Sequence, residues 1–418
     1  QETEPLPTYL FSFVAGKLQQ ETYSRENRSI SIYHRETDPA RKGQCPEIAR
    51  QVLDALDWME AYTGVPYPFA KYDLVILPGF QYGGMEHTGA TLYNDQSMFL
   101  NEEPTLDEQL RRSTLIAHET AHMWFGDYVT MKWFNDVWTI RIVEPTYPTI
   151  NHRLNFVRGY IPASYAEDRT DGATPIQQTL DNLRNAGLVY SNIVYDKSPV
   201  VMEMLIQRMG AEAFQRGLHD YLTTYAYSNA TWDQLIASLS QYTERDLDQW
   251  SQVWVKEAGM PVLKASVIGN RLRVEESDPW ERGLVWPQQL TYRICEGNKS
   301  EDVVLEIGDT SRVLTVELNQ KYDSPAILPN IYGRCFGFFE LNPKDVQGAF
   351  ACLDTTTDDM LKGSLLITLH ENLQNRTLKA EPFLQALIAY AKQEKNDLLY
   401  SMALGYISPA VRFLPARP

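Results

Sequence analysis

One segment of this 418-residue chain constrains its structure more than any other, and it reads PTLDEQLRRSTLIAHETAHMWFGD. Thr105 and Glu108 form a capping-box pattern that predicts the start of a helix, and Gly126 is a typical helix stop. His118 and His122 are four residues apart, so they lie on one face of this helix. Both imidazoles can then reach a single ion, and the segment predicts half of a metal site.

Glu119 stands beside the first of these histidines, where its carboxylate can move a proton. An HExxH pattern on a helix indicates zinc, with the glutamate as the general base. Zinc lowers the pKa of a bound water towards about 7, and Glu119 can take the proton and pass it to a leaving amine. The five-residue pattern also arises by chance, so the flanking sequence must show whether it marks a zinc site.

Composition narrows the classes of partner. The net charge of −16 argues against a nucleic-acid partner, which would need a basic footprint. The four cysteines are scattered without a CxxC pair, which indicates neither a cysteine zinc site nor a disulfide scaffold, although one isolated disulfide is compatible with them. We expect a soluble chain without a transmembrane segment, because no apolar run is long enough. The first residues lack the basic stretch of a signal peptide, so cytoplasmic, periplasmic and extracellular locations all stay open.

Hydrophobic periodicity predicts the order of the elements. Strands are expected first, then a long helix, then helices around and after the histidine pair, then a run of short strands, and finally helices again. The expected strands are residues 7–18, 28–35, 72–79, 261–277, 288–297, 302–308 and 311–319. The expected helices are residues 45–64, 104–126, 175–187, 198–210, 212–226, 231–243, 360–373 and 382–394.

Two further segments flank the histidine helix: GFQYGGMEHTGATLY before it and IVYDKSPVVMEML after it. Taken singly, the first reads as a glycine turn before a strand and the second as a helix with a structural tyrosine. Together with HETAHMWFGDYVTMKWFNDVW, and in this order, they resemble the aminopeptidase N-like zinc metallopeptidases. These are the gluzincin aminopeptidases, a family that includes leukotriene-hydrolase-type enzymes.

The resemblance implies a substrate-binding role for the segment GGMEH. Glu86 matches the family's carboxylate that holds the α-ammonium group of the substrate, and Gly83, Gly84 and Met85 complete the family's G-x-M-E-N motif. Two residues depart from the family motif: Gly84 stands where alanine is commoner, and His87 stands where asparagine is usual. Both departures bear on which substrate side chain is preferred. The expected partners are peptides with a free N-terminus.

The resemblance also implies the catalytic and metal-binding residues. Tyr195 matches the family tyrosine whose phenol stabilises the tetrahedral oxyanion, although Asp196 and Ser198-Pro199 depart from the family's Y-E-K-G. Glu119 is then the second catalytic residue, acting on a zinc-bound water. His118 and His122 are the expected ligands of one Zn²⁺ per chain.

The resemblance extends from about residue 5 to the end of the chain and implies an α+β multidomain fold. A thermolysin-like catalytic domain is followed by a small β-sandwich and by the start of an α-helical domain. The chain is therefore expected to be incomplete at both ends relative to the family. The expected domains are residues 1–20 (the end of an N-terminal β-domain), 21–259 (catalytic), 260–345 (β-sandwich) and 346–418 (helical).

The third zinc ligand is the weak point of this interpretation. The family's glutamate would fall at Arg141, and arginine has no acceptor with which to ligate zinc. Pro145 and Pro148 also do not suit the interior of the helix that should carry the ligand. Three explanations are open: Glu144 is a shifted ligand, the protein is a metal-free relative, or a helical segment is absent between Thr139 and Val143.

Three functions follow from these alternatives. The first is a zinc-dependent aminopeptidase that hydrolyses the N-terminal peptide bond, with Glu86 limiting cleavage to that bond. The second is a catalytically inactive peptide-binding or scaffold protein that lacks the third zinc ligand. The third is an epoxide hydrolase acting at the same site.

Overall fold

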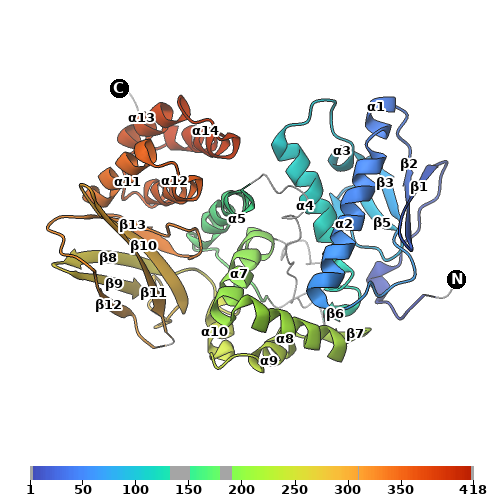
Figure 1. Ribbon diagram of the computed structural model, residues 1–418, viewed down its shortest axis with the longest axis horizontal. Coiled ribbons are helices and arrows are strands. Elements are labelled where there is room, and N and C mark those ends of the chain that lie inside the picture. The colour runs from blue at the N-terminus through green and yellow to red at the C-terminus, as the bar shows by residue number, and fades with distance from the viewer. Residues whose placement is uncertain (1–2, 132–150, 179–190, 309, 416–418) are drawn as a thin grey trace. The chain divides into compact units, whose positions relative to one another are not determined.

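The computed structural model describes residues 3–131, 151–178, 191–308 and 310–415 (Figure 1). The chain is a mixed α and β structure with several small sheets, and it forms two compact units. Unit 1 comprises residues 1–150 and 211–244, and unit 2 comprises residues 151–210 and 245–418.

Unit 1 is built around a five-stranded sheet and two long helices. Its described elements are η1 (Thr8–Leu10), β1 (Gln19–Arg25), β2 (Arg28–His34), α1 (Pro39–Lys42), α2 (Cys45–Thr63), β3 (Leu74–Leu77), β4 (Gly84–Met85), β5 (Thr91–Asn94), α3 (Asp95–Met98), α4 (Leu106–His122), β6 (Val129–Met131), α8 (Ala211–Thr224), β7 (Ser228–Ala230) and α9 (Trp232–Ser240). The strand order is β1-β2-β3-β5-β4. Strands β2, β3 and β5 run parallel, and the edge strands β1 and β4 run antiparallel to their neighbours.

The two long helices form where the sequence predicts them. In α2 the apolar positions Ile48, Val52, Leu56 and Met59 are fully buried, and Gly64 ends the helix in the left-handed region at φ 66°. The predicted capping box of α4 is confirmed, with the side chains of Thr105 and Glu108 each bonding the other residue's backbone N–H. Helices α2 and α4 pack against each other, which fixes the face on which α4 presents its histidines.

The strand predicted over residues 7–18 is wrong. The chain forms the short 3-10 helix η1 there, and the first strand, β1, begins only at Gln19. Aromatic and β-branched residues favour a strand only when a neighbouring strand takes up their backbone hydrogen bonds. Among the described residues, no strand pairs with residues 7–18.

Unit 2 combines a group of helices with two antiparallel-rich sheets. Its described elements are α5 (His152–Asp168), η5 (Ile193–Lys197), α7 (Ser198–Met209), α10 (Leu247–Trp254), β8 (Val262–Ile268), β9 (Arg271–Ser277), β10 (Gln288–Glu296), β11 (Lys299–Ile307), β12 (Val313–Glu317), β13 (Ala326–Pro329), β14 (Phe338–Glu340), α11 (Pro343–Thr355), α12 (Asp359–Gln374), α13 (Ala380–Ala391) and α14 (Asp397–Val411). The strands predicted over residues 288–297, 302–308 and 311–319 and the predicted C-terminal helices are confirmed. Residues 261–277, given as one strand, form the two antiparallel strands β8 and β9 joined by a turn. Most of the helix predicted over residues 175–187 lies outside the described residues.

The two sheets of unit 2 share one apolar core. One sheet has the order β11-β10-β13 and the other β12-β9-β8-β14. Burial alternates along β9 and along most of β11, as the period of two requires. The core residues include Leu263, Leu272, Val274, Leu290, Tyr292, Ile294, Leu305, Ile307, Ile327 and Phe339.

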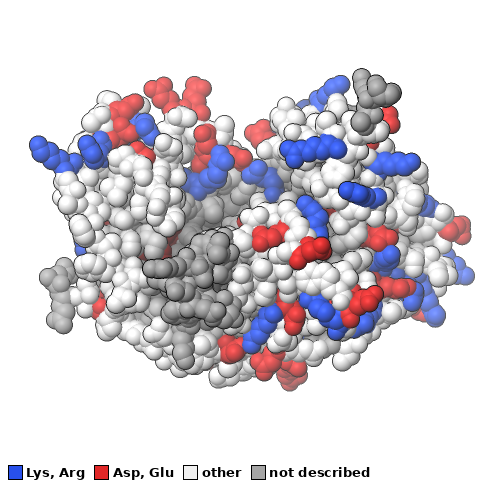
Figure 2. Space-filling view, turned by 180° about the vertical axis from the view of Figure 1, so that it is seen from behind, with Lys and Arg blue, Asp and Glu red and all other residues white. Residues whose placement is uncertain are grey.

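The cysteines, the helices and the surface charges can be described for the ranges given above. All four cysteines are free thiols. None of the described helices has the length and the apolar run needed to cross a bilayer. Figure 2 shows acidic and basic side chains interspersed among the described residues of one face, so the net charge of −16 is not gathered there into a single acidic patch.

Candidate metal centre

The last turn of α4 brings the two predicted metal ligands together. The Nε2 atoms of His118 and His122 lie 3.1 Å apart, and the ligand atoms of both residues lie within 4.8 Å of a Glu119 oxygen. Two nitrogens bound to one tetrahedral zinc at about 2.1 Å would be about 3.4 Å apart. The observed spacing therefore fits two ligands of a single ion.

The hydrogen bond of His122 selects the tautomer that a metal needs. Its Nδ1 lies 3.2 Å from the carbonyl oxygen of Phe125, which can only accept, so the proton is on Nδ1 and the Nε2 lone pair faces His118. Burial, with a smaller contribution from His122, lowers the pKa of His118 to about 3. Burial therefore favours the neutral form of the His118 imidazole, and neutral imidazole is the form that ligates metals.

The carboxylate of Glu119 is buried and packs against the backbone of Gly84. A Cβ on Gly84 would lie 2.6 Å from the Glu119 carboxyl carbon, closer than such contacts occur. Burial, together with the charge of Glu86, holds the pKa of the Glu119 carboxyl well above its usual range. A cation bound by the histidines would favour the ionised form of this carboxyl.

Strand β4 and the turn after it hold the predicted substrate-binding residues next to α4. Gly84 and Met85 pair with β5 at the sheet edge, Gly83 precedes them, and Glu86 follows directly. Helix α4 contacts β4, and Glu119 packs on Gly84. Glu86 therefore lies close to Glu119. Glu86 is half-buried.

Tyr195 lies in unit 2, on the π-helical turn η5, and 46% of its surface is exposed. Such turns are uncommon and are frequent at functional sites. Two residues on, the ammonium of the fully buried Lys197 lies 2.7 Å from Asp168 and donates to the carbonyl of Gly259 at 2.8 Å. This buried ion pair anchors the turn that carries Tyr195.

The residues proposed for the third ligand position, Arg141 and Glu144, lie outside the described residues. The described part of the chain therefore contains a candidate metal half-site, in which His118 and His122 could hold an ion with Glu119 beside them. The described residues therefore do not distinguish among the three explanations for the third ligand.

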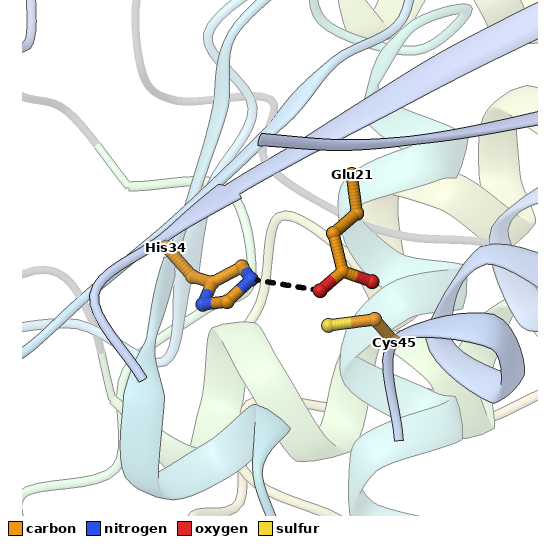
Figure 3. Close-up of side chains that lie close together, drawn as sticks. All are labelled: Glu21, His34 and Cys45. Atoms are coloured by element: carbon orange, nitrogen blue, oxygen red, sulfur yellow. Dashed lines mark ion pairs between the residues drawn. The ribbon is translucent and has the colours of Figure 1, made fainter. Parts of the chain in front are cut away.

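A second group of potential ligands, Glu21, His34 and Cys45, does not fit a metal ion (Figure 3). The Nδ1 of His34 accepts the backbone N–H of Glu36 at 3.2 Å, so the ring carries its proton on Nε2. That Nε2–H points at the carboxylate of Glu21, 3.5 Å away, and has no lone pair to offer. Burial also raises the pKa of the Cys45 thiol to about 12. The group is a cluster of polar side chains on β1, β2 and α2.

Sequence reasoning missed three residues that surround Glu86. The hydroxyl of Tyr9 donates to Glu86 Oε1 at 3.2 Å and lies 3.5 Å from Asp127 Oδ1, and Thr88 donates to Asp127 Oδ2 at 2.9 Å. Burial, with the charge of Glu86, holds the pKa of Asp127 well above its usual range. Asp127 ends the segment HETAHMWFGD and could have been singled out there. Tyr9 is 77 residues from Glu86 and gives no local signal.

A helix-borne pair of histidines with an adjacent buried carboxylate is the arrangement of a metallopeptidase, and a second carboxylate, Glu86, stands close to it. Comparison with known proteins agrees with this class. Residues 49–254 match the peptidase family M1 domain. This match, together with relatives that are named as aminopeptidases, supports an aminopeptidase N-like gluzincin family for the chain.

Three relatives illustrate the similarity. Puromycin-sensitive aminopeptidase of Caenorhabditis elegans is 29% identical over 343 residues, 78% of this chain and 35% of the relative. Aminopeptidase N of Streptomyces lividans is 29% identical over 284 residues, 64% of this chain and 33% of the relative. Tricorn protease-interacting factor F2 of Thermoplasma volcanium is 27% identical over 314 residues, 72% of this chain and 39% of the relative. The matched part of the chain thus spans between about a third and two fifths of the length of these relatives.

Proposed function

We propose that the protein is a zinc-dependent aminopeptidase that hydrolyses the N-terminal peptide bond of peptides. The observation that carries the proposal is the convergence of His118 and His122. Their Nε2 atoms lie 3.1 Å apart, and the hydrogen bond from His122 to Phe125 frees its Nε2 lone pair. The matched family and the names of the relatives support the peptidase class.

In this proposal His118 and His122 hold one zinc ion per chain. When bound there, zinc supplies a Lewis acid that makes water acidic enough to ionise near neutral pH. Glu119 takes a proton from the attacking water and returns it to the leaving amine. Its position against Gly84 restricts the directions in which the carboxylate can point.

Substrate recognition is assigned to the residues at the sheet edge. Glu86 attracts the α-ammonium group of the peptide through a charge-assisted hydrogen bond, and Gly83, Gly84 and Met85 form the adjoining wall. An anchored ammonium leaves no room for a residue before the cleaved bond, which restricts cleavage to the first bond. Tyr195 donates its phenolic proton to the oxyanion that develops in the transition state.

The proposed domain arrangement follows the family resemblance. Residues 1–20 end an N-terminal β-domain, residues 21–259 form a thermolysin-like catalytic domain, residues 260–345 a β-sandwich and residues 346–418 the start of a helical domain. The shared core of the two sheets in unit 2 supports the sandwich, and α11 to α14 support the helical part. The matched family domain over residues 49–254 falls within the proposed catalytic domain.

Turnover of a panel of aminoacyl-4-nitroanilides tests the proposal, with Glu119→Gln as the matched variant. Glutamine keeps the size of the side chain and removes its function as a base, so we expect kcat to fall by at least about 100-fold. Hydrolysis that survives this change at the original rate contradicts the role of Glu119.

The zinc content separates the enzyme from a metal-free binding protein. About one zinc per chain after reconstitution supports the enzyme, whereas no zinc supports the scaffold alternative. An anomalous-scattering map at the zinc edge then locates the ion and the residue at the third ligand position. It shows whether Arg141 or Glu144 lies there.

A further inference from the structure

The segment η1 is tied to the substrate-binding turn of unit 1 by two hydrogen bonds that the proposed function does not use. The hydroxyl of Tyr9 donates to Glu86 at 3.2 Å, and the carbonyl of Leu10 lies 3.2 Å from Nδ1 of His87. The carbonyl can only accept, so His87 carries its proton on Nδ1 and donates it. Two consecutive residues of η1 therefore hold two consecutive residues of the turn.

The hydroxyl of Tyr9 lies between two carboxylates. It has one proton, which it donates to Glu86, while its oxygen is 3.5 Å from Asp127. The other oxygen of Asp127 accepts from Thr88 at 2.9 Å, which holds this buried side chain in place. The two carboxylates repel each other, and the hydroxyl between them offsets part of that repulsion for Glu86.

Glu86 is held, within the described part of the chain, by the hydrogen bond from Tyr9. It follows the two-residue edge strand β4, whose ladder partner lies on one side only. A glutamate side chain loses as much as about 2 kcal/mol of rotamer entropy when it is held in one conformation. A carboxylate that is already held before the ligand arrives avoids this cost at the moment of binding.

We propose that Tyr9 is a positioning residue for Glu86, and that its hydroxyl sets the carboxylate in the orientation that accepts the α-ammonium group of a peptide. The inference rests on the proposed function of Glu86. It also gives His87 a role at the position where the family usually has asparagine. His87 docks the segment that delivers Tyr9.

The effect of Tyr9→Phe on KM and kcat tests the proposal, since the substitution removes only the hydroxyl. We expect KM for the best aminoacyl-4-nitroanilide to rise about tenfold, with kcat within about twofold of the original value. In a Glu86→Gln background the same substitution is expected to change KM little, because Tyr9 acts through the carboxylate. A rise in KM of equal size in both backgrounds overturns the proposal, as does an unchanged KM in the original protein.

Tyr23→Phe is the matched control. Its hydroxyl donates to the carboxylate of Glu21 at 2.6 Å in the same unit, so the control removes the same kind of bond away from β4. We expect it to leave KM and kcat unchanged. The thermal midpoints of both variants show whether either substitution loosens the fold, and a structural loss would lower activity in the Glu86→Gln background as well.

Glu86→Gln alone distinguishes the anchor role of Glu86 from the positioning role of Tyr9. A rise in KM with Glu86→Gln but none with Tyr9→Phe overturns the positioning role and leaves the proposed anchor intact. An unchanged KM with Glu86→Gln overturns the anchor itself, and the role of Tyr9 with it.

Discussion

Gly84 and Glu119 are packed so closely that no other residue type fits at position 84 without moving the carboxylate. A Cβ there would meet the carboxyl carbon of Glu119 at 2.6 Å and its Cγ at 2.7 Å. The backbone of the edge strand β4 thus acts as a stop for the side chain to which the proposed function assigns proton transfer.

Gly84→Ala is therefore expected to lower kcat. The carboxylate of Glu119 would have to rotate away, and a misplacement on the order of 1 Å costs between about tenfold and about 100-fold in rate. Steady-state kinetics on the 4-nitroanilide panel measures this. Gly16→Ala is the control, since a Cβ at Gly16 meets nothing within 4 Å. An unchanged kcat for Gly84→Ala would show that Glu119 has room to adjust.

The two histidine clusters of unit 1 are expected to respond differently to substitution. His122→Gln removes a ring whose Nε2 carries the lone pair, so the zinc content measured by mass spectrometry of the metal should fall from about one per chain towards zero. His34→Gln removes a ring whose Nε2 carries the proton, so the zinc content should stay unchanged. Circular dichroism establishes that both variants are folded. Loss of zinc in the His34 variant alone would reverse the assignment.

The ion pair between Lys197 and Asp168 is expected to matter for stability far more than a surface pair does. Both side chains are fully buried, so Lys197→Met leaves an uncompensated charge on Asp168. Breaking such a pair from one side costs about 3–5 kcal/mol in the free energy of unfolding. Chemical denaturation measures the change.

Arg271→Met is the matched control for this measurement. It breaks an exposed pair with Glu317, in which the side chains are 62% and 71% exposed, and pairs of this kind contribute less than about 1 kcal/mol. A loss for Lys197→Met no larger than that of the control would contradict the anchoring role of the buried pair.

The buried carboxyl of Glu276 predicts a pH dependence of stability. Burial raises its pKa to about 8, although the carboxyl accepts the N–H of Trp286 at 2.9 Å. The folded state then holds a proton that the unfolded state releases above its ordinary pKa of about 4.5. The contribution is therefore present below about pH 4.5 and is lost as the pH rises through about 8, by up to about 1.4 kcal/mol per unit.

Thermal midpoints of the original protein and of Glu276→Gln, measured from pH 4 to pH 9, test this prediction. Glutamine keeps the acceptor for Trp286 and cannot ionise. The difference between the two proteins should grow in favour of the variant as the pH rises, and parallel curves would refute the assignment.

Local sequence patterns were sufficient for the parts of the fold that depend on neighbours along the chain. The capping box at Thr105 and the fourfold spacing of His118 and His122 describe α4 as the structure has it. The packing of Glu119 on Gly84 joins positions that belong to separate motifs, and no periodicity encodes it.

Contacts between distant segments explain what was missed. The strand expected over residues 7–18 fails because strand formation needs a partner, and η1 instead places Tyr9 against Glu86 from 77 residues away. The cluster of Glu21, His34 and Cys45 combines residues from three elements. The cluster does not suit a metal because the backbone N–H of Glu36 donates to Nδ1 of His34 and so places the ring proton on Nε2.

Unit 1 is assembled from two stretches of chain that are separated by about sixty residues of unit 2. Strand β6 takes its parallel partner β7 from the second stretch, and the end of α2 receives His219 and Gln215 from α8. During synthesis on a ribosome, the first 150 residues must therefore wait for residues 211–244 before their apolar surfaces are covered. The nascent chain therefore passes through a stage in which the end of α2 and strand β6 lack their partners, and exposed surface of this kind favours aggregation.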